Sequence, residues 1–68
     1  MKHLTARQMA SILNVRGWTL VRQSGSHMVF KKFEVDHIIV VPDHRGRTLS
    51  TGTQRRIMRD AEISPDEL

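Results

Sequence analysis

The sequence predicts an α+β fold in which a helix, three antiparallel strands and a second helix follow one another. Three observations predict it: helical spacing of apolar residues near both ends, three short strand-like runs between them, and turn residues separating these runs. The chain has 68 residues, which suits a single domain over 1–68. We expect a two-layer α-β-β-β-α sandwich with both helices on one face of the three-stranded sheet, because their apolar sides then share one core.

The first helix is predicted over residues 6–16. Thr5 and Gln8 have the spacing of a capping box, which satisfies free N–H groups at a helix start. Gly17 follows the last turn, where a residue with positive φ ends many helices. The apolar stripe expected to face the core consists of Met9, Ile12 and Leu13.

Three strands are predicted over residues 18–23, 28–32 and 37–41. These runs contain most of the β-branched and aromatic residues of the chain. A turn at Ser24-Gly25 and a polar turn near 34–36 separate them, so the strands should form an antiparallel meander.

Alternation along the second strand places Phe30 toward the helices and His27 on the opposite face of the sheet. A two-residue turn at 34–35 would pair His27 with Pro42. This register brings His44 close to His27 in space.

The second helix is predicted from Thr51 or Gly52 to about residue 61. Thr51 and Gln54 repeat the capping-box spacing. The buried side should consist of Ile57, Met58 and Ala61, and the exposed side of Arg55, Arg56 and Arg59.

The distribution of charge favours a polyanionic partner. The chain has 11 basic and 7 acidic residues, and residues 1–59 hold all the basic ones with only three of the acidic ones, a net charge of +8. Such a density of positive charge on a small domain is typical of binding to nucleic acid.

The absence of cysteine excludes a disulfide framework and a thiolate zinc site. A zinc site built from His27, His37 and His44 is disfavoured because their spacing matches no closed motif, so neither a metal nor another cofactor is expected. No apolar run approaches the length of a membrane span, and the N-terminus has no signal-peptide pattern. We therefore expect a cytoplasmic protein that does not enter a membrane.

The segment Gly25-Ser26-His27 is the strongest candidate for chemistry. Glycine allows a tight turn or a close approach to a ligand, and serine adds a small hydroxyl. Histidine is the side chain that gains and loses a proton near neutral pH. A proton-transfer group beside a turn, at the start of an apolar strand, is a reasonable catalytic arrangement.

Several motifs in order resemble the HicA (YcfA-type) family of mRNA interferase toxins. They are Gly17-Trp18, Arg22, Gly25-Ser26-His27 with Phe30, Val41-Pro42-x-His44, and Leu49-x-x-Gly52-Thr53 with Ile57. The resemblance covers nearly the whole chain. One departure is the turn at 33–36, which lacks the glycines expected there.

This resemblance implies a fold like that of the double-stranded RNA-binding domain and an endoribonuclease toxin that cleaves mRNA and inhibits translation and growth. It implies that the catalytic histidine is His27. It also implies a protein partner, an antitoxin of the HicB type.

RNA cleavage can proceed without metal if a base deprotonates the ribose 2′-OH, an acid protonates the leaving 5′-oxygen and cations stabilise the phosphorane. His27 is the predicted proton-transfer group. The candidate accessory residues are Ser26, His44, Arg22 and Lys31. Residues predicted to bind RNA phosphates are Arg22, Lys31, Lys32, Arg45, Arg47 and Arg55.

A second interpretation keeps the basic surface and omits catalysis: a non-catalytic RNA-binding module of the double-stranded RNA-binding-domain type. A DNA-binding helix-turn-helix is disfavoured because strands separate the two helices.

Residues 38–41 are apolar in both directions of the strand. One pair should therefore form an exposed patch beside His27, which we expect an antitoxin to cover. The alternatives are that a homo-oligomer covers the patch or that the strand is buried within the domain.

Overall fold

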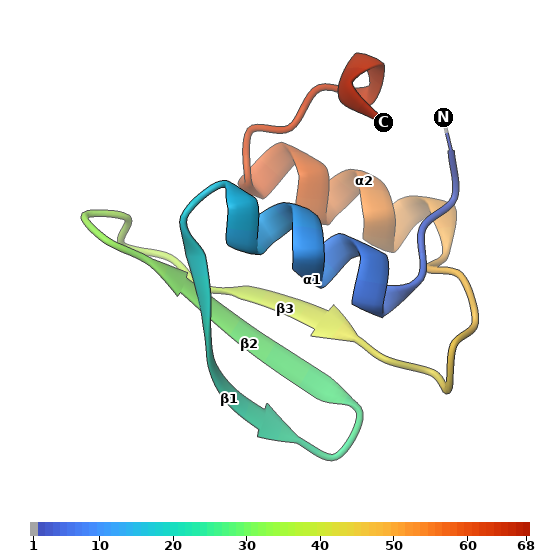
Figure 1. Ribbon diagram of the computed structural model, residues 1–68, viewed down its shortest axis with the longest axis horizontal. Helices are drawn as coiled ribbons and strands as arrows, with labels where there is room; N and C mark the ends of the chain where they lie inside the picture. The colour runs from blue at the N-terminus through green and yellow to red at the C-terminus, as the bar shows by residue number, and fades with distance from the viewer. Residues whose placement is uncertain (1) are drawn as a thin grey trace.

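The helices and strands follow the predicted order in the computed structural model of the protein, which describes residues 2–68 (Figure 1). No helix within this part of the chain is long and apolar enough to span a membrane. The elements are α1 (Ala6–Val15), β1 (Trp18–Ser24), β2 (His27–Lys32), β3 (Ile39–Pro42), α2 (Thr51–Asp60) and a 3-10 helix, η1 (Pro65–Glu67). The α-β-β-β-α order confirms the predicted α+β fold class.

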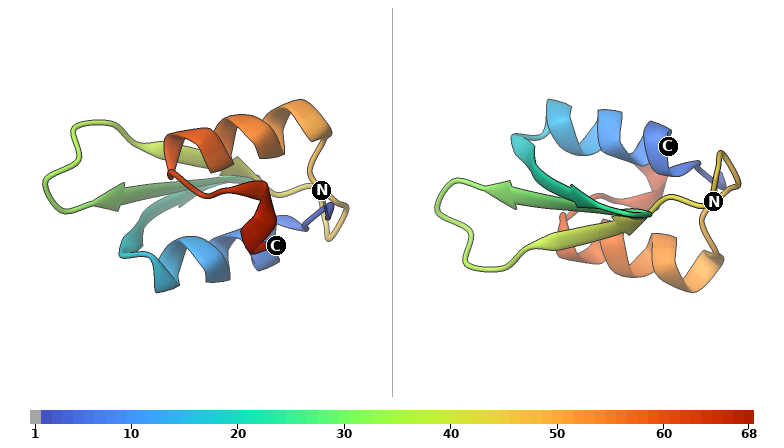
Figure 2. Two further views of the ribbon diagram at one scale, coloured as in Figure 1. Left: turned by 90° about the horizontal axis from the view of Figure 1, so that it is seen from above. Right: turned by 90° about the horizontal axis from the view of Figure 1, so that it is seen from below.

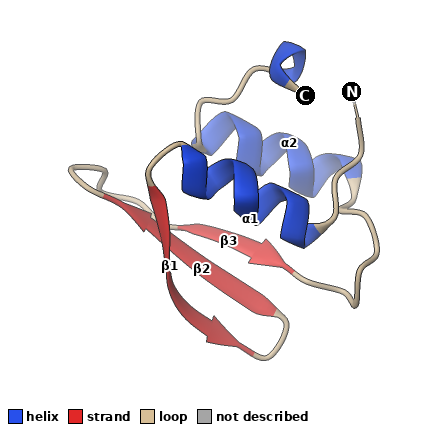
Figure 3. Ribbon diagram, viewed as in Figure 1, coloured by secondary structure: helices blue, strands red, loops and turns tan. Residues whose placement is uncertain are grey.

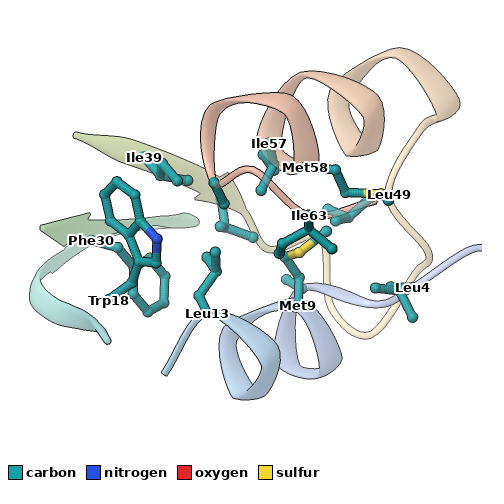
Figure 4. Close-up of a cluster of buried hydrophobic side chains, with 13 residues drawn as sticks. Leu4, Met9, Leu13, Trp18, Phe30, Ile39, Leu49, Ile57, Met58 and Ile63 are labelled. Atoms are coloured by element: carbon teal, nitrogen blue, oxygen red, sulfur yellow. The ribbon is translucent and has the colours of Figure 1, made fainter. Parts of the chain in front are cut away.

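The three strands form one antiparallel sheet in the order β1-β2-β3, and α1 and α2 form the second layer (Figures 2 and 3). Side chains from both helices and from one face of the sheet meet in one core, around Leu13, Trp18 and Phe30 (Figure 4). Exposed residues such as Arg22, His27 and Lys31 occupy the opposite face of the sheet, which we call the open face. Burial of a single sheet face explains why both helices lie on the same side.

The predicted capping residues at the two ends of α1 are confirmed. Thr5 and Gln8 form the predicted capping box, and Gly17 has a φ of 93° after the helix. Met9 and Leu13 are fully buried.

The β1–β2 turn differs from the prediction by one residue. Its central residues are Gly25 and Ser26, and Ser24 pairs with His27, which is thus the first residue of β2. Gly25 has a φ of 58°, whereas the φ of Ser26 is not positive. This combination fits the type II′ hairpin turn.

The predicted register between β2 and β3 is confirmed, but the predicted two-residue turn at 34–35 is wrong. His27 pairs with Pro42 and Phe30 with Ile39, while residues 33–38 form a longer loop. The paired residues are still symmetric about positions 34 and 35, so the register is the one that the shorter turn would give. The strand starts two residues later than predicted because His37 turns toward the end of α2, where its Nε2 lies 3.1 Å from the backbone oxygen of Asp60.

The predicted capping box at Thr51 is also wrong. Ser50 is the N-cap of α2, and its side chain accepts a hydrogen bond from the N–H of Thr53. Gln54 is completely buried, where its side chain accepts a hydrogen bond from the N–H of Leu4 and donates one to the carbonyl of Lys2. Gln54 therefore attaches the N-terminal segment to α2 and is unavailable for capping.

Candidate functional site

The open face of the sheet carries His27 at the start of β2. His27 is exposed, and within residues 2–68 no hydrogen bond or ion pair fixes its ring. The tight turn at Gly25-Ser26 and the pairing of His27 with Ser24 and Pro42 set the position of its backbone. The imidazole is thus presented to solvent at the start of β2, where a ligand can reach it.

Arg22 is the strand cation nearest to His27. It pairs with Val29, two residues along β2 from His27, so the two stand diagonally on the open face. Such diagonal neighbours are roughly 7–8 Å apart, within reach of an arginine side chain. Lys31 lies on the same face but four residues along the strand, about 13 Å from His27. Arg22 is therefore the better placed of the two to contact a group bound at His27.

A hollow of about 320 Å³ lies beside the β1–β2 turn and is lined by Ser26, Asp43, His44, Arg45 and Arg47. The N–H of Asp43 donates to the carbonyl of Ser26 across 2.6 Å, which joins the turn to the chain after β3. Since Pro42 pairs with His27, His44 follows two residues after the partner of His27. The fold thus brings four of the predicted site residues together beside His27.

Two of the predicted RNA-binding residues lie elsewhere. Lys32 is on the helix side of the sheet, where its aliphatic part lies against Gly17 and it lines a hollow with Trp18. Arg55 is exposed on α2, in the layer opposite the open face. Neither residue can join Arg22 and His27 on one continuous sheet surface.

His37 is separated from the other two histidines of the disfavoured zinc site. The centre of its ring lies 5.6 Å from the centre of the Trp18 ring. In the chain, His37 precedes β3, whereas His44 follows β3. Within residues 2–68 no group of three or more potential metal ligands is present.

Arg7 is a basic residue near the site that the sequence pattern does not single out. It lines a second hollow, of about 430 Å³, together with Thr5, Asp43, Arg45 and Gly46. No local signal could have found it, because the hollow joins α1 to a loop nearly forty residues away in the sequence.

The predicted apolar patch is present on the open face. Ile39 and Val41 are buried in the core, whereas Ile38 is 48% exposed and Val40 is partly exposed. Val21, at an irregularity in β1, is 52% exposed. The alternative that the third strand is wholly buried is therefore wrong.

The fold and this surface define a small two-layer α-β-β-β-α protein whose open sheet face combines an exposed histidine, strand cations and an apolar patch. Residues 6–63 match the family described as "HicA toxin of bacterial toxin-antitoxin". The chain belongs to the HicA toxin family, as its motifs suggested, and its role is that of the toxin in such a system. No curated protein matches the chain.

Proposed function

We propose that the protein is a metal-independent endoribonuclease that cleaves mRNA in the cytoplasm, with His27 as the essential proton-transfer group. The observation that carries the proposal is the exposed His27 at a tight turn on a basic open face, in a chain of a toxin family. The cleaved mRNA can no longer be translated, which accounts for growth inhibition by a toxin.

The chemistry requires one proton to leave the ribose 2′-OH as it attacks phosphorus and one to reach the departing 5′-oxygen. His27 performs the first or the second of these transfers. His44, beside Ser26 in the neighbouring hollow, is the candidate for the other. Arg22 and the more distant Lys31 supply positive charge as the pentavalent phosphorane forms.

The products test the mechanism. Because the nucleophile is the 2′-OH, the protein should cleave RNA in excess chelator, leave 2′,3′-cyclic phosphate and 5′-OH ends, and spare DNA of the same sequence. End-group analysis after incubation with mRNA and chelator measures all three. Ends carrying 5′-phosphate, or loss of activity with chelator, would indicate a metal-activated water instead.

The non-catalytic RNA-binding module remains the second candidate, favoured by the absence of a protein group that orients the His27 ring within residues 2–68. The same assay separates the two, since a binding module protects RNA but leaves it intact.

The partner should be an antitoxin of the HicB type that covers the open face. Ile38, Val40 and Val21 offer apolar contact, and Arg22 and Lys31 offer charge for acidic side chains. We expect slower hydrogen exchange in β2 and β3 when the antitoxin is bound. Protection restricted to the helices, with the open face still exchanging freely, would contradict this arrangement, and concentration-dependent protection of the toxin alone would indicate a homo-oligomer.

A further inference from the structure

The loop formed by residues 43–47, between β3 and α2, is a tight turn with an arginine at an unusual position. The N–H of Arg47 donates to the carbonyl of His44, and the two central residues, Arg45 and Gly46, have φ values of 53° and 80°. Two central residues with positive φ characterise a type I′ turn, which favours Asn, Asp or Gly at both positions. Arginine at the first of them is held in a conformation that other residues adopt more easily.

Hollows lie on both sides of this loop. The hollow beside Ser26 and the hollow beside Arg7 share Asp43 and Arg45. A third hollow, of about 460 Å³, shares His44 and Arg47 with the hollow beside Ser26. The loop thus stands at the centre of a concave surface that begins one residue from His27.

The charge of this surface is unbalanced. Arg7, Arg45 and Arg47 are exposed, and within residues 2–68 none of them forms an ion pair. Asp43 is the one acidic residue that lines these hollows. Three unpaired guanidinium groups around concave surface suit phosphate groups, which they can contact through two hydrogen bonds each.

Both ends of the loop are attached to the rest of the domain. The N–H of Asp43 donates to Ser26, and the N–H of Leu49 donates to the carbonyl of Leu4 across 2.7 Å. The first of these bonds attaches the start of the loop to the residue before His27, which places the loop beside the histidine, as a subsite for a substrate requires.

We propose that loop 43–47 and Arg7 form a subsite that binds the phosphates of single-stranded RNA on one side of the cleaved bond. The inference rests on the proposed ribonuclease function and extends it. The strand must be unpaired at His27, because an A-form duplex holds the 2′-oxygen out of line with the leaving 5′-oxygen. The subsite lies on only one side of the cleaved bond, because the hollows extend from His27 in one direction, past Ser26 and Pro42.

The first test measures how cleavage depends on substrate length. Wild-type protein is compared with an Arg45→Asn/Arg47→Gln variant on a dinucleotide and on oligonucleotides extended by three nucleotides toward the 5′ or the 3′ side. In the wild type, extension on one side should raise kcat/KM through a lower KM. The variant should lose about three- to tenfold of this gain at low salt, and its loss on the dinucleotide should be smaller than its loss on the extended substrate.

Asn is chosen at position 45 because it tolerates positive φ. The variant should therefore unfold at a Tm no lower than that of the wild type, so loss of activity cannot be attributed to unfolding. The matched control is Arg56→Ala, which removes a positive charge from an exposed position on α2 that lines none of these hollows. An equal loss in this control would show a general charge effect and overturn the subsite.

A binding measurement keeps the test independent of catalysis. Fluorescence anisotropy with His27→Ala protein and labelled single-stranded RNA gives the slope of log K against log salt concentration. The magnitude of this slope should fall by about 0.7 for each phosphate contact that Arg45→Asn, Arg47→Gln or Arg7→Gln removes. Cleavage with no dependence on length, or slopes that stay constant, would overturn the subsite while the ribonuclease proposal stands. Absence of cleavage in the wild type would instead refute the ribonuclease proposal, and equal competition by duplex RNA would refute the choice of a single strand.

Discussion

Replacing His27 by alanine is expected to lower the rate of RNA cleavage by about 10²–10⁴-fold, the usual contribution of a proton-transfer group. The imidazole is exposed and makes no hydrogen bond within residues 2–68, so the free energy of unfolding should change by less than about 0.5 kcal/mol. Cleavage rates and thermal unfolding of the same preparation measure both effects. A variant that cleaves RNA at a rate close to that of the wild type would exclude His27 as the catalytic residue.

His37→Ala is the matched control for this experiment. His37 contacts Trp18 and the backbone of Asp60 at the far end of β3, so its loss should reduce stability and leave the activity of the folded protein unchanged. His44→Ala separates the two proton transfers. A fall comparable to that of His27→Ala would identify His44 as the second group, whereas a change confined to KM would place it in phosphate binding.

Replacing Gln54 by alanine should destabilise the protein by about 2–4 kcal/mol. The substitution leaves the buried N–H of Leu4 without an acceptor and opens space in a fully buried site. The total stability of a chain of 68 residues is about 3–10 kcal/mol, so this single change removes a large part of it. Urea denaturation monitored by circular dichroism gives the difference.

Gln54→Met separates packing from hydrogen bonding, because methionine fills a similar volume and accepts no strong hydrogen bond. It should still cost more than about 1 kcal/mol. Arg56→Ala, on the exposed side of the same helix, should change stability by less than about 0.5 kcal/mol. A value for Gln54→Ala as small as that of Arg56→Ala would show that the N-terminal segment does not depend on this side chain.

The starts of the two helices show which contacts a local sequence pattern can predict. At α1 the capping box of Thr5 and Gln8 was predicted correctly, because both partners lie within one turn. At α2 two cap spacings overlap, from Ser50 to Thr53 and from Thr51 to Gln54. Only the second contains a capping-box glutamine, yet Gln54 binds backbone groups of Leu4 and Lys2, some fifty residues away, and Ser50 becomes the cap. The local pattern contained no sign of this partner.

The sequence by itself determined the order of the elements, the register of β2 against β3 and the exposure of His27 on the open face. The element order and the exposure of His27 follow from side-chain alternation and from turn and cap residues that act over a few positions, whereas the register was predicted correctly from a turn that the structure does not contain. The same alternation already places Lys32 on the side of Phe30, away from His27, but only the tertiary structure decided that Arg7 joins loop 43–47 beside Ser26. The physical reason is that burial of the core residues on one face of the sheet determines which distant loops and helix ends come into contact. The periodicity within a single segment contains no information about these long-range contacts.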